Sequence, residues 1–103
     1  MLAYGIKFSP EADEQLAALA AHHRAMLLDG VEWQLSQQPT VETRNRKRMR
    51  EGERVPVAPW ELRMGPLRVY YDVEESPERL VMVVAIGVKV RNRVRIGEKE
   101  IEP

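Results

Sequence analysis

The sequence contains no cysteine, which excludes disulfide bridges, thiolate metal sites and a cysteine nucleophile. It also has no apolar run long enough to cross a membrane, and Met1 to Gly5 lack the apolar stretch of a signal peptide. Glycine-rich phosphate loops, HExxH motifs and nucleophile elbows are absent as well. We therefore expect a soluble cytoplasmic protein without a cofactor.

A histidine metal site is also not expected. His22 and His23 are adjacent, and neighbouring positions on a helix point about 100° apart. The pair therefore cannot share one metal ion, and no cysteine or HExxH motif offers further ligands.

Charge is distributed unevenly along the 103 residues, although the formal net charge is zero. Residues 1–43 hold two basic and six acidic side chains, whereas residues 44–95 hold thirteen basic and seven acidic ones. Such asymmetry indicates that one part of the surface attracts an anionic partner. The length and the hydrophobic share of 44% suit a single domain over residues 1–103.

The first half of the sequence predicts one strand followed by two helices. Tyr4–Phe8 alternates as a strand does, and Ser9-Pro10 is a strong helix start because serine caps free N–H groups and proline suits the first turn. A second helix is predicted through Leu27, Val31 and Leu35 to about residue 37. We expect the two helices to form a hairpin.

The second half changes to a period of two, which is typical of strands. Trp60–Met64 and Leu67–Val73 flank a Gly65-Pro66 turn, and Leu80–Ile86 is continuously apolar, as in a central strand covered on both faces. The predicted fold class is α+β: an N-terminal strand, a helical hairpin, then an antiparallel strand meander. Trp33 and Trp60 are expected in the core or in helix packing.

Two runs place a basic residue at every second position. The first arginine comb is Arg44, Arg46, Arg48 and Arg50, and the second arginine comb is Lys89, Arg91, Arg93 and Arg95. In an extended chain each comb would project its charges from one face. Charged edge strands that resist aggregation are one interpretation, but the excess of arginine over lysine favours phosphate binding and base stacking. Tyr70 could stack on a base or pack against a neighbouring strand.

The run Trp60–Val73, with its L-R, short turn and R-V-x-Y, resembles the hairpin of RelE/ParE-superfamily toxins from type II toxin–antitoxin systems. Val84–Lys89 is similar to the last core strand of these toxins and the glycine–lysine exit after it. The resemblance spans essentially the whole chain. It implies a toxin that cleaves messenger RNA on the ribosome without a metal, together with a cognate antitoxin as partner.

The resemblance also implies roles for individual residues. Arg68 would stabilise the transition state as a ribose 2′-hydroxyl attacks the adjacent phosphate, with Lys47 and Lys89 as further catalytic residues. The side chains expected to contact RNA are Arg44, Arg46, Arg48, Arg50, Arg63, Tyr70, Arg91, Arg93 and Arg95.

Two alternative functions remain open at this point. A ParE-like toxin would inhibit DNA gyrase and have no nuclease activity. A degenerate member would only bind RNA or its antitoxin, because Glu61 and Arg95 stand where RelE has a lysine and a stacking tyrosine.

Overall fold

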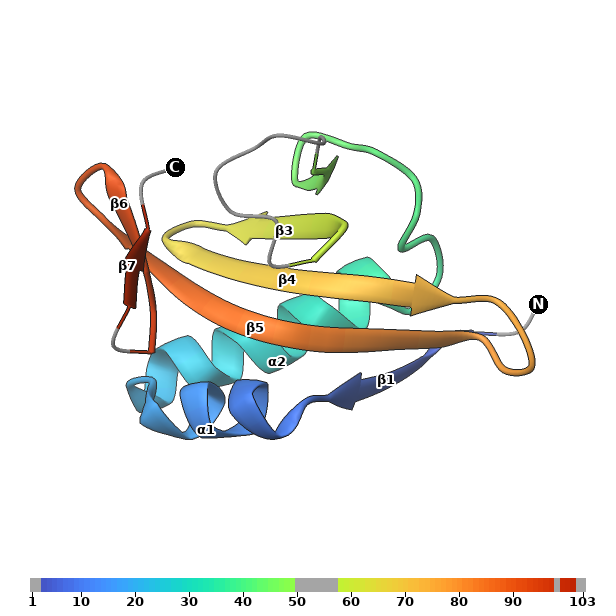
Figure 1. Ribbon diagram of the computed structural model, residues 1–103, viewed down its shortest axis with the longest axis horizontal. Coiled ribbons are helices and arrows are strands. Elements are labelled where there is room, and N and C mark those ends of the chain that lie inside the picture. The colour runs from blue at the N-terminus through green and yellow to red at the C-terminus, as the bar shows by residue number, and fades with distance from the viewer. Residues whose placement is uncertain (1–2, 50–57, 98, 102–103) are drawn as a thin grey trace.

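The computed structural model describes residues 3–49, 58–97 and 99–101. Along the chain the elements are β1 (Gly5–Phe8), α1 (Pro10–Ala18), α2 (Ala21–Leu35), β2 (Arg46–Arg48), β3 (Trp60–Met64), β4 (Leu67–Glu74), β5 (Leu80–Val90), β6 (Arg93–Ile96) and β7 (Lys99–Ile101). The helical hairpin lies on one side of the sheet (Figure 1). The predicted α+β class and element order are confirmed.

The two helices begin and end where local chemistry supports it. Ser9 Oγ accepts a hydrogen bond of 3.0 Å from the Ala12 N–H, and Pro10 opens α1, as predicted. Arg24, in the first turns of α2, donates to carbonyl oxygens of the last turn of α1 and so ties the hairpin together. Neither helix in the described part of the chain is long and apolar enough to cross a membrane.

The sheet is antiparallel in the order β2-β3-β4-β5-β6-β7, and β1 joins it in parallel beside β5. β5 has 11 residues, so one of its edges accommodates β1 along residues 80–83 and β6 along residues 87–90. The β3–β4 hairpin turns at Gly65, whose φ of 55° suits glycine. The sequence predicted both this hairpin and the central position of β5.

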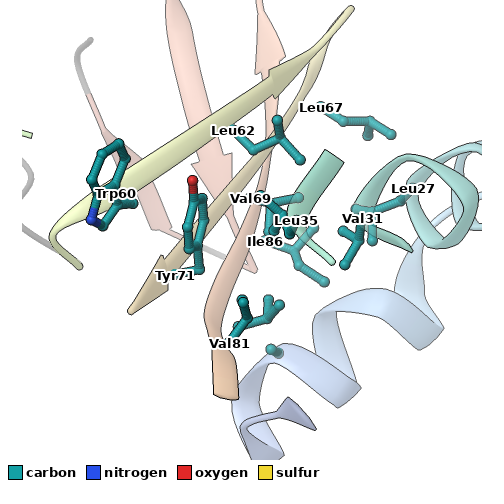
Figure 2. Packing of buried hydrophobic residues seen from close by; sticks show 12 residues of the cluster. Leu27, Val31, Leu35, Trp60, Leu62, Leu67, Val69, Tyr71, Val81 and Ile86 are labelled. Carbon is teal, nitrogen blue, oxygen red and sulfur yellow. The ribbon is translucent and has the colours of Figure 1, made fainter. Parts of the chain in front are cut away.

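The main core lies between the helices and the sheet. Leu27, Val31 and Leu35 of α2 point at apolar side chains of β3, β4 and β5 (Figure 2). At one end of this core the rings of Trp60 and Tyr71 stack at 6.1 Å, and the buried Tyr71 hydroxyl donates to the Pro39 carbonyl at 2.7 Å.

The face of the sheet that the helices do not cover, here called the open face, carries a smaller apolar cluster. Its buried members are Ala58, Tyr70, Ala85, Val94 and Ile96. The β5–β6 hairpin contributes to it because Gly87 allows close approach: a Cβ there would lie 2.6 Å from Val94 Cγ1. β5 is therefore covered on both faces, as its continuous apolar run predicted.

The expectation for Trp33 is wrong, whereas that for Trp60 is confirmed. Trp60 is 6% exposed, but Trp33 is 82% exposed. Trp33 lies two positions from both Val31 and Leu35, and two positions correspond to about 200° around a helix. With Val31 and Leu35 facing the sheet, Trp33 must point away from it.

Candidate nucleic-acid interface

Basic side chains from four strands meet on the open face. Lys47, Glu61, Tyr70 and Ala85 are consecutive cross-strand partners from β2 to β5. Partners across antiparallel strands point to the same side of a sheet.

The next row contains Arg63, Arg68 and Gly87, and Lys89 follows two residues after Gly87 on the same side. The structure thus brings Lys47, Arg63, Arg68 and Lys89 together on one face.

Arg68 is held in place by the turn that precedes it. Its side chain is 8% exposed, and Nη1 donates to the carbonyls of Gly65 at 2.7 Å and Leu67 at 2.9 Å. No described residue accepts a hydrogen bond from its Nε or Nη2. Burial lowers the pKa of the Arg68 guanidinium, and Arg63 lowers it further, whereas Glu61 opposes this shift. An arginine remains charged despite such a shift, so Arg68 presents an ordered cation.

Glu61 is the carboxylate that organises this face. It is 6% exposed, and its Oε1 lies 2.6 Å from Nε of Arg63. Tyr70 is 3% exposed, and burial, the negative charge of Glu61 and a hydrogen bond to that carboxylate all raise its pKa. Tyr70 therefore packs against its neighbours and is not a surface platform for bases, which decides between the two interpretations of this residue. In the sequence Glu61 stands out only because RelE has a lysine at this place, and no pattern indicates its contacts with Arg63 and Tyr70.

A hollow of about 380 Å³ borders the open face at the β2–β3 edge. It is lined by Glu42, Thr43, Arg46, Lys47, Arg48, Met49, Glu61 and Arg63. The Thr43 hydroxyl accepts from the N–H groups of Asn45 and Arg46, which forms the turn into β2. Glu42 accepts from the Arg48 N–H at 3.0 Å and so secures the strand.

Within β2 the first arginine comb does keep to one side, because Arg46 and Arg48 pair with Leu62 and Trp60, but this is the helix side and not the open face. Arg46 is 8% exposed and points to the helix side, where Nε donates to Val41 O at 3.0 Å and Nη1 donates to Gln34 O. The prediction of Arg46 as an RNA contact is corrected, because its side chain points to the helix side, away from Lys47, Arg63 and Arg68. Arg48 lies over the Trp60 ring at 5.7 Å, and Arg44 is exposed before β2. Arg50 lies outside the described residues.

The side chains of the second arginine comb do not share one face of the sheet, because the chain reverses within it. β5 ends at Val90, Arg91 adopts a φ of 58° in the turn, and β6 begins at Arg93. Lys89 faces the open side opposite Val94, whereas Arg93 and Arg95 pair with apolar residues of the helix side. The prediction of one cationic strand face is therefore wrong. A second hollow of about 490 Å³ lies at this tip, lined by Val90, Arg91, Asn92, Arg93 and Arg95.

The arrangement on the open face suits phosphate binding. Arg63 and Arg68 are adjacent cross-strand partners, and like charges held side by side are stabilised by a polyanion. Among residues 3–49 and 58–97, no group of three histidine, aspartate or glutamate side chains is placed to hold a metal ion.

Comparisons with known proteins support the fold. No protein-family model matches the chain, and no curated protein matches it either. A solved structure, the toxin–antitoxin complex RelBE2 from Mycobacterium tuberculosis, contains a chain that is 21% identical. The match covers 86% of the present chain and 94% of that chain, with a TM-score of 0.71. The chain thus shares its α+β fold with a chain of the RelBE2 complex, which confirms the fold that its motifs predicted.

Proposed function

We propose that this chain is the toxin of a type II toxin–antitoxin pair, acts in the cytoplasm and inhibits translation by cleaving messenger RNA on the ribosome. The observation that carries the proposal is the open face, where Arg63 and Arg68 lie side by side between Lys47 and Lys89. The fold shared with a toxin–antitoxin complex supports the same assignment.

The proposed reaction is an attack of a ribose 2′-hydroxyl on the adjacent phosphorus. A bond forms between O2′ and phosphorus, the bond to the 5′ oxygen of the next nucleotide breaks, and negative charge increases on the phosphoryl oxygens. Arg68 is fixed by two carbonyls through Nη1 and directs its remaining donors at this charge. A donor held in place before reaction stabilises the transition state without reorganisation. Lys47 and Lys89, on the same face, would hold the flanking phosphates or relay the proton lost by O2′ to the departing 5′ oxygen, so that the products are a 2′,3′-cyclic phosphate and a 5′-hydroxyl.

The assignment of Arg68 is tested by expression without the antitoxin. We expect growth arrest and cuts in translated messages, mapped by primer extension, and we expect Arg68→Ala to abolish both. Lys7→Ala is the control, because it removes an exposed positive charge of β1 that is not among the expected RNA contacts. Full arrest and unchanged cuts with Arg68→Ala, in a folded protein, would show that the site is misassigned.

A gyrase inhibitor is the second candidate, and the second hollow favours it. Arg91, Arg93 and Arg95 form a basic tip whose two strand arginines face away from the open face, so a DNA-bound target could use it independently of Arg68. Supercoiling assays with purified gyrase separate the nuclease from the gyrase inhibitor. Inhibition of supercoiling that persists in Arg68→Ala and is lost when the tip arginines are replaced would support the gyrase inhibitor. Normal growth on expression, with intact RNA or antitoxin binding, would instead indicate a degenerate member.

A cognate antitoxin is the proposed protein partner. The neighbouring fold comes from a toxin–antitoxin complex, and a short adjacent open reading frame is the expected source. Co-expression of its product should restore growth and yield a complex that purifies as one species. Arrest that persists in the presence of a bound adjacent product would contradict the pairing.

A further inference from the structure

The outer surface of α2 carries the most exposed large apolar side chain of the described residues. Trp33 is 82% exposed, whereas the next values are 53% for Val90, 46% for Val41 and 43% for Leu28. An indole this exposed contributes nothing to the core, which α2 contacts through its opposite face (Figure 2). This outer surface lies on the helix side of the molecule, away from the arginines of the open face.

Trp33 borders a hollow on this surface. The hollow measures about 420 Å³ and is lined by Asp29, Glu32, Trp33, Ser36 and Gln37. Asp29 lies one turn before Trp33 on the helix surface, and Glu32, which directly precedes Trp33, lies one turn after Asp29. Two carboxylates beside an accessible aromatic face are the groups that recognise a cation: the ring attracts it electrostatically and the carboxylates pair with it.

The end of α2 that forms one side of the hollow is held in place. The Ser36 carbonyl accepts from the Tyr4 N–H at 2.7 Å, and the Gln34 carbonyl accepts from Arg46 Nη1. These bonds attach the end of α2 to the residue that precedes β1 and to β2. A rigid site loses little conformational entropy when a partner binds.

We propose that this surface, Asp29–Trp33 with Ser36 and Gln37, is a docking site for a protein segment that presents an arginine or lysine beside an apolar side chain. The cation would lie over the Trp33 ring and pair with the carboxylates that line the hollow, and the apolar side chain would cover the remaining indole. This site is separate from the proposed RNA surface and does not depend on it.

Charge disfavours nucleic acid, anionic lipid and a two-fold contact with a second copy. Phosphates of a nucleic acid or of an anionic lipid surface would meet Asp29 and Glu32 and be repelled. A two-fold contact with a second copy would bring the same carboxylates against each other. A cationic protein segment is the partner that gains from both the indole and the acids.

The test uses the full chain and a synthetic amphipathic peptide with arginine four residues after leucine. The two indole N–H resonances are followed by NMR, with Trp33→Phe to assign them. Trp60 is buried, so we expect the Trp33 signal alone to shift. Affinity should fall about tenfold in Trp33→Ala and at least about threefold in Asp29→Asn/Glu32→Gln.

Matched controls separate this site from a general charge effect and from the proposed function. Glu14→Gln removes an exposed acid of α1 and should leave the peptide affinity unchanged. Arg68→Ala should also leave it unchanged, even where it abolishes growth arrest. A lysine peptide should bind, and a glutamate peptide should not.

Three results would overturn the proposal. They are equal binding of the glutamate peptide, no shift of the Trp33 signal at millimolar arginine peptide, and a dimer in sedimentation that depends on Trp33. The last would identify a second copy as the occupant.

Discussion

Substitution of Arg46 tests stability and RNA binding separately, because its side chain lies in the interior and not on the proposed RNA surface. Its guanidinium donates to the carbonyls of Val41 and Gln34. A hydrogen bond from a charged donor contributes about 1.5–3 kcal/mol, and a buried carbonyl left without a donor adds a penalty. Allowing for the desolvation of a buried cation, we expect Arg46→Ala to lower the free energy of unfolding by about 2–4 kcal/mol.

Urea denaturation followed by circular dichroism measures this loss, with an unchanged dependence on denaturant if the transition stays two-state. Arg44→Ala is the matched control, since Arg44 is exposed and a surface change should stay within about 0.5 kcal/mol. Arg46→Lys keeps the charge but not the two-pronged donor geometry, so it should retain part of the stability.

The same variants are then compared in RNA binding across salt concentrations. Arg46→Ala should leave the salt dependence of RNA binding unchanged. Arg63→Ala should reduce the slope of the log binding constant against the log salt concentration by about 0.7, the value for one phosphate on a single strand. Arg46 does not have the proposed structural role if Arg46→Ala is as stable as Arg44→Ala. It contacts RNA after all if Arg46→Ala reduces the slope as much as Arg63→Ala does.

Three further predictions concern the hairpin of helices, the β5–β6 hairpin and the open face. Arg24→Ala removes three bonds to carbonyls at the end of α1 and should cost about 1.5–3 kcal/mol in thermal or urea unfolding; a change under 0.5 kcal/mol would contradict it. Gly87→Ala places a Cβ 2.6 Å from a Val94 methyl and should cost about 1–3 kcal/mol by the same measurement, whereas Gly5→Ala, with 3.6 Å to its nearest neighbour, should be nearly neutral. The pKa of Tyr70 in the folded chain is raised above its ordinary value of 10.0. Its contribution to the free energy of unfolding is therefore complete below pH 10 and is lost at higher pH, where the phenol ionises in the unfolded chain first. Urea midpoints at increasing pH should therefore fall more steeply for the wild type than for Tyr70→Phe above about pH 10, and equal slopes would show that the buried phenol is not responsible.

Local patterns in the sequence determined most of the fold. Ser9-Pro10 marks the start of α1 by chemistry that lies within one helical turn. The period-two runs around Gly65 and the long apolar run of β5 predicted the β3–β4 hairpin and its central neighbour. The R-V-x-Y motif added the fold family, and the structural comparison confirmed that fold.

The candidate site depended on tertiary structure because alternation predicts a face only while a strand continues. The turn at Arg91 reverses the chain, so Lys89 and Arg93 point to opposite sides of the sheet. Arg46 lies in a short edge strand, and its side chain faces the helices because it donates there to the carbonyls of Gln34, at the end of α2, and of Val41, in the loop before β2. No local pattern contains that information.

By itself, the sequence determined the order of the elements, the hairpin that carries Arg68 and the excess of positive charge in the second half of the chain. The tertiary structure decided which of those charges share a surface. Strand pairing set Lys47, Arg63 and Arg68 in adjacent rows around the buried Glu61, and helix packing turned Trp33 outward. The physical reason is that periodicity is a property of neighbouring residues, whereas burial and cross-strand register are set by contacts between residues far apart in the chain.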